Sequence, residues 1–183
     1  MDRNRFTKGS PEGSLRLGLD TAMGHTAMTD IRPQAPLQED GTPAGSYLRI
    51  DPAAVARNYR TLAARSGGEC GGVVKANAYG LGIEPVARAL WAAGCKSYFV
   101  ALPAEGLLLR KILPGATIYV LNGLFDDVRF GKAHNLIPFL SCLDAVSAWG
   151  DAPFALNVDT SMNRLGVKPS DVAAIDRTPV LVA

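Results

Sequence analysis

The sequence has few of the features that mark disulfide-rich or metal-binding proteins. Its 183 residues include only three cysteines, Cys70, Cys95 and Cys142, an odd number without a Cys-x-x-Cys pair. A disulfide framework and a zinc site are therefore not expected, and we predict no metal. Because each cysteine lies in or beside an apolar run, we expect three buried free thiols, which suit a reducing cytoplasm.

Charge and hydropathy exclude further classes of protein. The 19 basic and 17 acidic side chains nearly balance, to a net charge of +2, so neither a nucleic acid nor a membrane surface is indicated as a partner. No apolar run approaches the roughly 18 residues of a transmembrane helix. What remains is an ordinary globular composition, 48% hydrophobic and 20% charged, which is sufficient to bury a core.

Residues 1–46 contrast with the rest of the chain. They are rich in Gly, Pro, Thr, Asp and Arg, sustain no apolar period and contain no signal-peptide pattern. We therefore predict a disordered N-terminal extension over 1–46 and a folded domain over 47–183. A start of translation at Met23 or Met28 is the alternative explanation for the extension.

The folded part opens with signals for a strand and a helix. Tyr47–Ile50 alternates apolar and polar residues, which is typical of a short strand. Asp51-Pro52 then combines an N-cap residue with a proline at the first helical position, and Gly67-Gly68 stop the helix.

A repeated strand–helix pattern follows. Apolar runs that predict buried strands lie at 72–76, 98–102, 117–121, 137–141, 154–158 and 179–183, with helix signals between them at 83–93, 104–113, 126–133, 144–149 and 170–175. Strands that are apolar throughout are buried on both faces, so this pattern predicts a parallel α/β sheet. A doubly wound sheet and a (β/α)₈ TIM-type barrel both fit, although no Gly-x-Gly-x-x-Gly follows the first strand. A whole barrel takes about 250 residues, so a barrel here would be incomplete, with roughly five βα units and the start of a sixth strand.

Lys75 stands at the end of the predicted strand 72–76. Lysine is rarely buried without a partner, and the C-terminal ends of barrel strands carry catalytic residues. In a partly desolvated site a lysine can present a neutral amine, which attacks an aldehyde to form a Schiff base. A lysine paired with a carboxylate of a neighbouring strand is equally compatible with the spacing.

Two further polar residues follow predicted strands. Tyr79 lies four residues beyond Lys75, where its hydroxyl could donate to a phosphate, although packing is the commoner role of a loop tyrosine. Arg164 follows the fifth strand and would share a rim with Lys75 if all strands run parallel. Its guanidinium suits carboxylate, phosphate or phenolate oxygens. On spacing alone, a surface arginine paired with Asp159 or Asp171 is the better interpretation of Arg164.

These residues lie in two segments that resemble the signatures of alanine racemases. The family's cofactor motif, V-K-A-x-A-Y-G-x-G, reads Val74-Lys75-Ala76-Asn77-Ala78-Tyr79-Gly80-Leu81-Gly82 here, and Asp159–Gly166 resembles the family's arginine loop. The resemblance also covers 99–106, 109–110 and 118–123, and it is nearly continuous from Tyr47. It implies a (β/α)₈ barrel followed by a C-terminal β-rich domain, which we expect to be absent from these 183 residues.

The resemblance also implies a function and its residues. Alanine racemases are cytoplasmic enzymes that interconvert L-alanine and D-alanine with pyridoxal 5'-phosphate. By position, Lys75 matches the lysine that holds the cofactor as an internal aldimine and serves as one of two catalytic bases. Tyr79 matches the tyrosine that hydrogen-bonds the cofactor phosphate, and Arg164 matches the arginine near the cofactor's phenolic oxygen and the substrate carboxylate. The family's second base is a tyrosine from the partner subunit of a homodimer, and it has no counterpart here.

Two positions depart from the family pattern. Asn157 stands where some members carry a carbamylated lysine that orients the arginine, and Ser161 replaces a common loop glycine. If that glycine needs a positive φ, serine costs about 1 kcal/mol. We expect a racemase fragment that is inactive alone. The alternatives are a non-catalytic barrel that holds pyridoxal phosphate for its homeostasis, a racemase of another amino acid, and a truncated product whose open sheet edges favour aggregation.

Overall fold

The computed structural model describes residues 38–41, 48–123 and 128–183. The chain divides into two units, Met1–Tyr47 and Leu48–Ala183, and all the helices and strands described lie in the second. The disordered extension expected over 1–46 falls almost wholly outside the described residues and stays a prediction. Within the described ranges, no helix has the length and hydropathy needed to cross a membrane.

Helix α1 (Pro52–Ser66) opens the second unit. Asp51 caps it, because its side chain accepts the Ala54 N–H at 3.0 Å, and this bond holds the pKa of the Asp51 carboxyl below its usual value. Gly67 ends the helix in the left-handed conformation, at φ 65°. Both predicted helix ends are confirmed. The short strand predicted before Asp51 is wrong for the residues described there, because they have no neighbouring strand to pair with.

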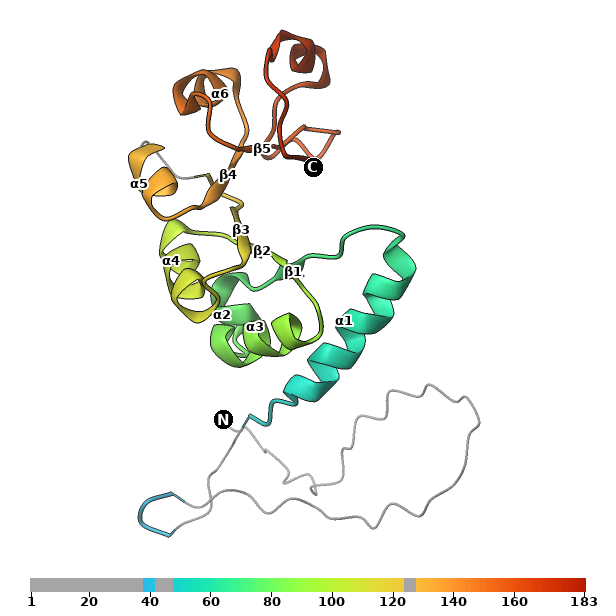
Figure 1. The fold of residues 1–183 in the computed structure, drawn as a ribbon, viewed down its shortest axis with the longest axis vertical. Helices are drawn as coiled ribbons and strands as arrows, with labels where there is room; N and C mark the ends of the chain where they lie inside the picture. The colour runs from blue at the N-terminus through green and yellow to red at the C-terminus, as the bar shows by residue number, and fades with distance from the viewer. Residues whose placement is uncertain (1–37, 42–47, 124–127) are drawn as a thin grey trace, which may run out of the picture. The chain divides into compact units, whose positions relative to one another are not determined.

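Six strands form one parallel sheet in chain order (Figure 1). They are β1 (Gly72–Val73), β2 (Ser97–Val100), β3 (Thr117–Val120), β4 (Ile137–Leu140), β5 (Ala155–Leu156) and β6 (Leu181–Val182). Every neighbouring pair is parallel. A doubly wound sheet reverses its strand order at a switch point, whereas a barrel wall keeps the order of the chain. The expected incomplete TIM-type barrel is therefore confirmed.

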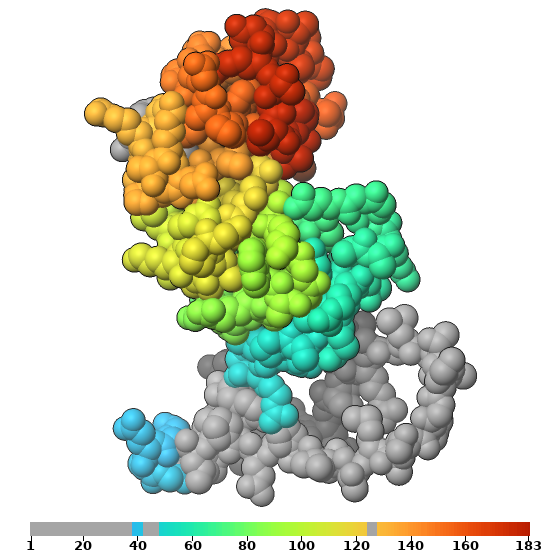
Figure 2. Space-filling model, viewed as in Figure 1, coloured from blue at the N-terminus to red at the C-terminus, as the bar shows by residue number. Residues whose placement is uncertain are grey.

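Helices alternate with the strands as the periodicity predicts, except that the short segment Lys75–Tyr79 was not expected to be helical and has a left-handed backbone at 76–78. They are α2 (Lys75–Tyr79), α3 (Ile83–Ala92), α4 (Pro103–Ile112), α5 (Val128–Ala133), α6 (Leu143–Trp149) and a 3₁₀ helix, η1 (Pro169–Ala174). Figure 1 shows α4, α5 and α6 along one side of strands β3 to β5. In Figure 2 the successive strand–helix units of the second unit follow one another in colour from green through yellow to red, so chain neighbours are also neighbours in space.

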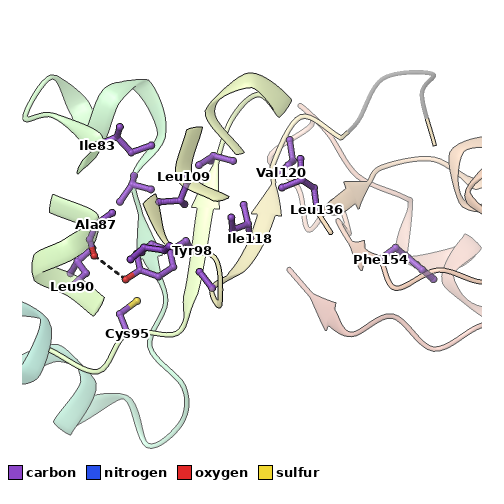
Figure 3. Packing of buried hydrophobic residues seen from close by; sticks show 14 of the residues in the cluster. Ile83, Ala87, Leu90, Cys95, Tyr98, Leu109, Ile118, Val120, Leu136 and Phe154 are labelled. Atoms are coloured by element: carbon purple, nitrogen blue, oxygen red, sulfur yellow. Dashed lines mark hydrogen bonds between the residues drawn. The ribbon is translucent and has the colours of Figure 1, made fainter. Parts of the chain in front are cut away.

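The central strands β2 to β5 are largely buried on both faces, in agreement with their apolar sequences, whereas Val73 of β1 and Val182 of β6 are exposed. Successive strand residues point to opposite faces. Tyr98 and Ile118 pack toward the helices, against Leu109 of α4, and the Tyr98 hydroxyl donates to the Ala87 carbonyl at 3.1 Å (Figure 3). The aromatic side chains of Phe99, Tyr119 and Phe139 form a second cluster on the other face, where the Phe99 and Tyr119 ring centroids are 5.0 Å apart. This second face is the wall that would line the interior of a barrel.

The three cysteines do not share one environment. Cys95 is buried and Cys70 is half-buried, whereas Cys142 is exposed. The expectation of three buried thiols is therefore wrong for Cys142. This residue is the N-cap of α6, so it lies past the end of the apolar strand β4 and outside the core.

Candidate functional site

A cavity of about 610 Å³ lies at the carboxyl ends of the strands. Its polar lining comes from Lys75, Asn122, Asn157 and Arg164, and its apolar lining includes Phe99, Leu121, Phe139 and Leu181. Small-molecule sites commonly have volumes of about 300–1,000 Å³ with a mostly apolar wall and a few polar groups. In barrels the carboxyl ends of the strands form the catalytic face. The cavity therefore has the place, size and composition of a small-molecule site.

Lys75 lies beyond β1, not within a strand. The strand ends at Val73, so the strand expected over 72–76 is too long by three residues. Residues 76–79 follow in a left-handed turn, with φ between 51° and 56° at each of them. A left-handed conformation costs about 1–2 kcal/mol for a residue with a Cβ, and asparagine tolerates it better than alanine or tyrosine, so this turn is strained chiefly at Ala76, Ala78 and Tyr79. Such strain persists only where surrounding contacts hold it, and it concentrates at functional sites.

Contacts from three directions hold the strained turn. Ala78 is buried, with 2% of its surface exposed. The Asn77 side-chain oxygen accepts the Ile83 N–H at 2.8 Å, which fixes the end of the turn to the start of α3. The Ala76 N–H donates to the Glu105 carboxylate at 2.7 Å, which fixes the beginning of the turn to α4. Because Glu105 is 29 residues away in the chain, local propensity could not have predicted this conformation.

The Lys75 side chain is half-buried and lines the cavity. Within the part of the chain that the structure describes, no carboxylate lies within ion-pair distance of its amine, so the strand carboxylate considered above is not found. The amine nitrogen lies 5.9 Å from the ring centroid of Tyr79. Tyr79 itself is 64% exposed and does not contribute to the cavity lining. The structure thus brings Lys75 and Arg164 into one cavity and leaves Tyr79 beside it.

The loop that carries Arg164 is closed by Asp159. The Asp159 carboxylate accepts the N–H groups of Ser161 at 3.1 Å and Asn163 at 2.9 Å. Asp171 accepts the hydroxyl of the residue before it, Ser170. Neither carboxylate forms an ion pair with Arg164 among the described residues, so the surface ion pair that spacing favoured is not present. The Arg164 guanidinium is exposed and lines the cavity.

The charge of the cavity determines what it can bind. Lys75 and Arg164 are the charged residues of its lining, and both are cationic. The wall below them is aromatic, and burial raises the pKa of the neighbouring Tyr119, whose phenol therefore stays neutral. A planar ligand with anionic groups fits this combination, since its ring can lie against the apolar wall and its anions can accept from the two cations.

Three residues at or near the cavity were not predicted as site residues from the sequence. Asn122 follows β3 and Asn157 follows β5, and both line the cavity. Asn122 lies just past the predicted strand 117–121 and Asn157 near the end of the predicted strand 154–158, which was a usable signal because such positions share one rim in a parallel barrel. Glu105 holds the Lys75 turn from α4. Its signals were its place in the family-like segment 99–106 and its position three residues after the N-cap Leu102, where a glutamate commonly caps a helix.

Comparison with known proteins agrees with this geometry. The family model described as "Alanine racemase, N-terminal domain" matches residues 50–178. The alanine racemase of Acidiphilium cryptum is 47% identical over 143 residues, which are 74% of this chain and 40% of that protein. A catabolic alanine racemase of Mesorhizobium japonicum is 45% identical over 143 residues, 72% of this chain and 38% of that protein.

A solved structure is similar in fold as well as in sequence. The alanine racemase of Bartonella henselae, with covalently bound pyridoxal phosphate, has a TM-score of 0.64 and 38% identity, over 68% of this chain and 40% of that chain. The chain thus spans about 40% of the length of the relatives it matches. The family match over most of the folded part, together with the parallel barrel wall, shows that this chain belongs to the alanine racemase family.

Proposed function

We propose that this chain forms the cofactor-binding half of an alanine racemase active site, and that the assembled enzyme interconverts L-alanine and D-alanine. The observation that carries the proposal is the placement of Lys75 and Arg164 in one cavity at the carboxyl ends of the strands. Among the described residues neither side chain has a carboxylate partner. Two cations in a partly apolar cavity are available to a ligand because they are not neutralised by the protein.

The residues of the cavity fit pyridoxal 5'-phosphate. This cofactor is planar and carries an aldehyde, a phenolic oxygen and a phosphate. The cavity of about 610 Å³ is large enough for it and an amino acid, and it combines an amine, a guanidinium and an aromatic wall. Lys75 would hold the cofactor through its amine. Arg164 would donate to the phenolic oxygen and to the substrate carboxylate, while the exposed Tyr79 would donate to the phosphate from the edge of the site.

When bound, pyridoxal phosphate supplies a conjugated ring that withdraws electrons from the substrate and makes its Cα proton removable. Lys75 would have the role of the base: when its amine is not engaged in holding the cofactor, it would accept or return the Cα proton on the face of alanine that it reaches. Arg164 orients alanine by binding its carboxylate, which presents one face of Cα to Lys75. Inversion needs a second base on the opposite face. The described lining of the cavity offers Lys75 as its single base.

The assembled enzyme and the chain alone would differ in the number of bases that reach alanine. We propose that the second base comes from another subunit of a homodimeric enzyme in the cytoplasm, as the family resemblance implies. The chain alone would then bind cofactor and exchange protons on one face of alanine, without efficient racemisation. A barrel that only stores pyridoxal phosphate is the second candidate function, and the presence of one base in the lining is the observation that favours it.

Cofactor capture tests the first part of the proposal. The purified chain is incubated with pyridoxal phosphate, reduced with borohydride and digested, and the modified lysine is located by mass spectrometry. We expect modification at Lys75 and its loss in Lys75→Ala. Lys111→Ala is the matched control, because Lys111 is an exposed lysine on α4. Labelling that is spread over surface lysines, and unchanged in Lys75→Ala, would remove the basis for the proposed function.

Proton exchange tests the second part and separates the two candidate functions. The chain with cofactor is incubated in deuterium oxide with L-alanine or D-alanine, and the Cα proton is followed by NMR. We expect exchange of one enantiomer without inversion, and none in Lys75→Ala. Exchange of neither enantiomer would favour the storage barrel, and rapid inversion would show that the chain already holds both bases. Serine and bulkier amino acids in the same assay test the substrate preference.

A further inference from the structure

Glu105 makes more hydrogen bonds than a helix cap requires. It lies in the first turn of α4 and its Oε2 accepts the N–H of Leu102, the N-cap residue, at 3.0 Å. This bond is the ordinary contribution of a glutamate to a helix start. The same oxygen also accepts the Ala101 N–H at 2.8 Å, and the second oxygen, Oε1, accepts the Ala76 N–H at 2.7 Å. Capping explains the bond to Leu102, but it does not explain the bond to a turn 29 residues away.

The bond to Ala76 acts on the backbone of Lys75. The Ala76 N–H belongs to the peptide plane that begins at the Lys75 carbonyl, so fixing this N–H fixes the rotation of that plane about the Lys75 Cα. The Val74 N–H donates to the Phe99 carbonyl on the other side of Lys75, so Glu105 and this sheet bond together restrain the direction of the Lys75 Cα–Cβ bond. The contact is short, and hydrogen bonds to a carboxylate are about twice as strong as those between neutral groups.

The turn needs such an anchor at its beginning. Its later part is held by the Asn77 side chain, which accepts the Ile83 N–H at 2.8 Å, and by Gly80, whose N–H donates to the Ala76 carbonyl at 3.1 Å. The Asn77 bond holds the C-terminal end of the turn and the Gly80 bond spans the turn, while the Ala78 N–H donates to the Val74 carbonyl at 2.9 Å across Lys75. Glu105 supplies the tertiary side-chain bond on the side next to Lys75. Without it, the strained residues could relax toward a right-handed or extended backbone and carry Lys75 with them.

We propose that Glu105 is a positioning residue that fixes the Lys75 backbone for cofactor capture. The inference rests on the proposed role of Lys75. Glu105 does not enter the cavity lining, so it acts through the Ala76 N–H and does not contact the ligand. One carboxylate joins the ends of β1 and β2 and the first turn of α4, which makes the Lys75 turn part of the barrel wall.

Glu105→Gln is the test variant. Glutamine keeps the shape of the side chain but has one acceptor oxygen, so it cannot accept on both sides as the carboxylate does. Glu84→Gln is the matched control, because Glu84 is an exposed glutamate in the first turn of α3 whose described partner is Arg88. Hydrogen exchange of the cofactor-free proteins is measured for the peptide of the Lys75 turn and for a peptide that covers β3.

We expect Glu105→Gln to accelerate exchange in the Lys75 turn by roughly tenfold or more, the equivalent of losing one charged hydrogen bond, while β3 is unchanged. Borohydride-trapped pyridoxal phosphate at Lys75 should fall by a similar factor at limiting cofactor, and Glu84→Gln should match the wild type in both measurements. Equal acceleration in β3 would mean that Glu105 supports the fold as a whole, and would overturn the proposal. Unchanged exchange and unchanged capture would overturn it as well.

A second measurement on the unmodified chain covers a variant that fails to fold. The Ala76 amide lies in an exposed residue, yet the proposal requires it to be protected to a degree similar to the Val74 amide, which donates to the Phe99 carbonyl within the sheet. Exchange of the Ala76 amide at the rate of an open amide in NMR spectra would refute the anchor. If the wild type captures no cofactor at Lys75 while its exchange behaves as expected, the proposed function fails and the backbone anchor remains.

Discussion

Arg110 connects three segments of the barrel wall through carbonyl groups. Its Nη1 donates to the Pro114 carbonyl at 2.8 Å and the Ala116 carbonyl at 2.6 Å, its Nη2 to Asn135 at 2.7 Å and its Nε to His134 at 3.3 Å. The end of α4, the start of β3 and the turn before β4 are thereby joined. Partial burial lowers the pKa of the Arg110 guanidinium, which nevertheless stays charged.

We expect Arg110→Ala to lower the free energy of unfolding by about 2–4 kcal/mol. The bond to the Ala116 carbonyl is partly buried, and a hydrogen bond to a charged group contributes about 1.5–3 kcal/mol net. The other three bonds are exposed. Their carbonyls recover water after the substitution, so together they add roughly 0.5–1 kcal/mol. Arg110→Lys should restore less than half of the loss, because an ammonium group cannot donate in four directions of one plane.

Urea unfolding, followed by tryptophan fluorescence and circular dichroism, measures both variants against the wild type. Arg88→Ala is the control, because Arg88 forms an exposed ion pair with Glu84 one helical turn away. Such pairs contribute about 0.3–0.5 kcal/mol. If Arg110→Ala costs no more than Arg88→Ala, or if Arg110→Lys is as stable as the wild type, the multiple-carbonyl explanation is incorrect.

Three further changes have calculable outcomes. Ser161→Gly should raise the free energy of unfolding by about 1 kcal/mol. Ser161 has φ 94°, a positive φ that glycine adopts more readily than serine, and the family commonly has glycine at this position. An unchanged urea midpoint would contradict this expectation. Gly166→Ala should lower the free energy of unfolding by about 2–4 kcal/mol and weaken cofactor capture. Gly166 has φ 137°, and a Cβ added there would lie 2.4 Å from the Asp159 backbone nitrogen. A urea midpoint equal to that of the wild type would refute this prediction. Burial raises the pKa of Tyr59 to about 12 and also raises the pKa of Tyr98. The stability that these neutral phenols contribute should therefore be fully present below pH 10.0 and fall as the pH rises toward 12, which urea unfolding across that range measures. A urea midpoint that does not change with pH would show that these phenols ionise freely in the folded chain.

Much of the architecture follows from local patterns. Asp51-Pro52 and Gly67 set the ends of α1, because capping depends on groups within one turn of the helix. The strands were recognised because residues buried on both faces must be apolar throughout, and Ile118 to Val120 illustrate this. Such patterns locate elements to within a few residues, since the ends of strands depend on their neighbours. This explains why the strand expected over 154–158 is reduced to Ala155–Leu156.

Other features required contacts between distant residues. The left-handed turn at 76–79 was missed because alanine, asparagine and tyrosine prefer other conformations, and the bond from Ala76 to Glu105 is not visible in the chain order. The exposure of Cys142 was missed because apolar neighbours in the sequence do not show whether a residue lies within a buried strand or just past its end. The motif located Tyr79 near Lys75 but could not show that Tyr79 stays outside the cavity lining.

The sequence by itself determined the kind of fold, because the periodicity of apolar residues reflects burial, and its motif predicted which residues react. It placed Lys75 at the end of one strand and Arg164 after another, and it predicted a parallel barrel wall. Only the tertiary structure decided whether these two cations face one cavity and whether Asp159 neutralises Arg164. Lys75 and Arg164 are far apart in the chain, so whether they meet depends on the parallel pairing of the strands and on the strained turn. Asp159 and Arg164 lie in one loop, and there the backbone N–H groups of Ser161 and Asn163 bind the carboxylate.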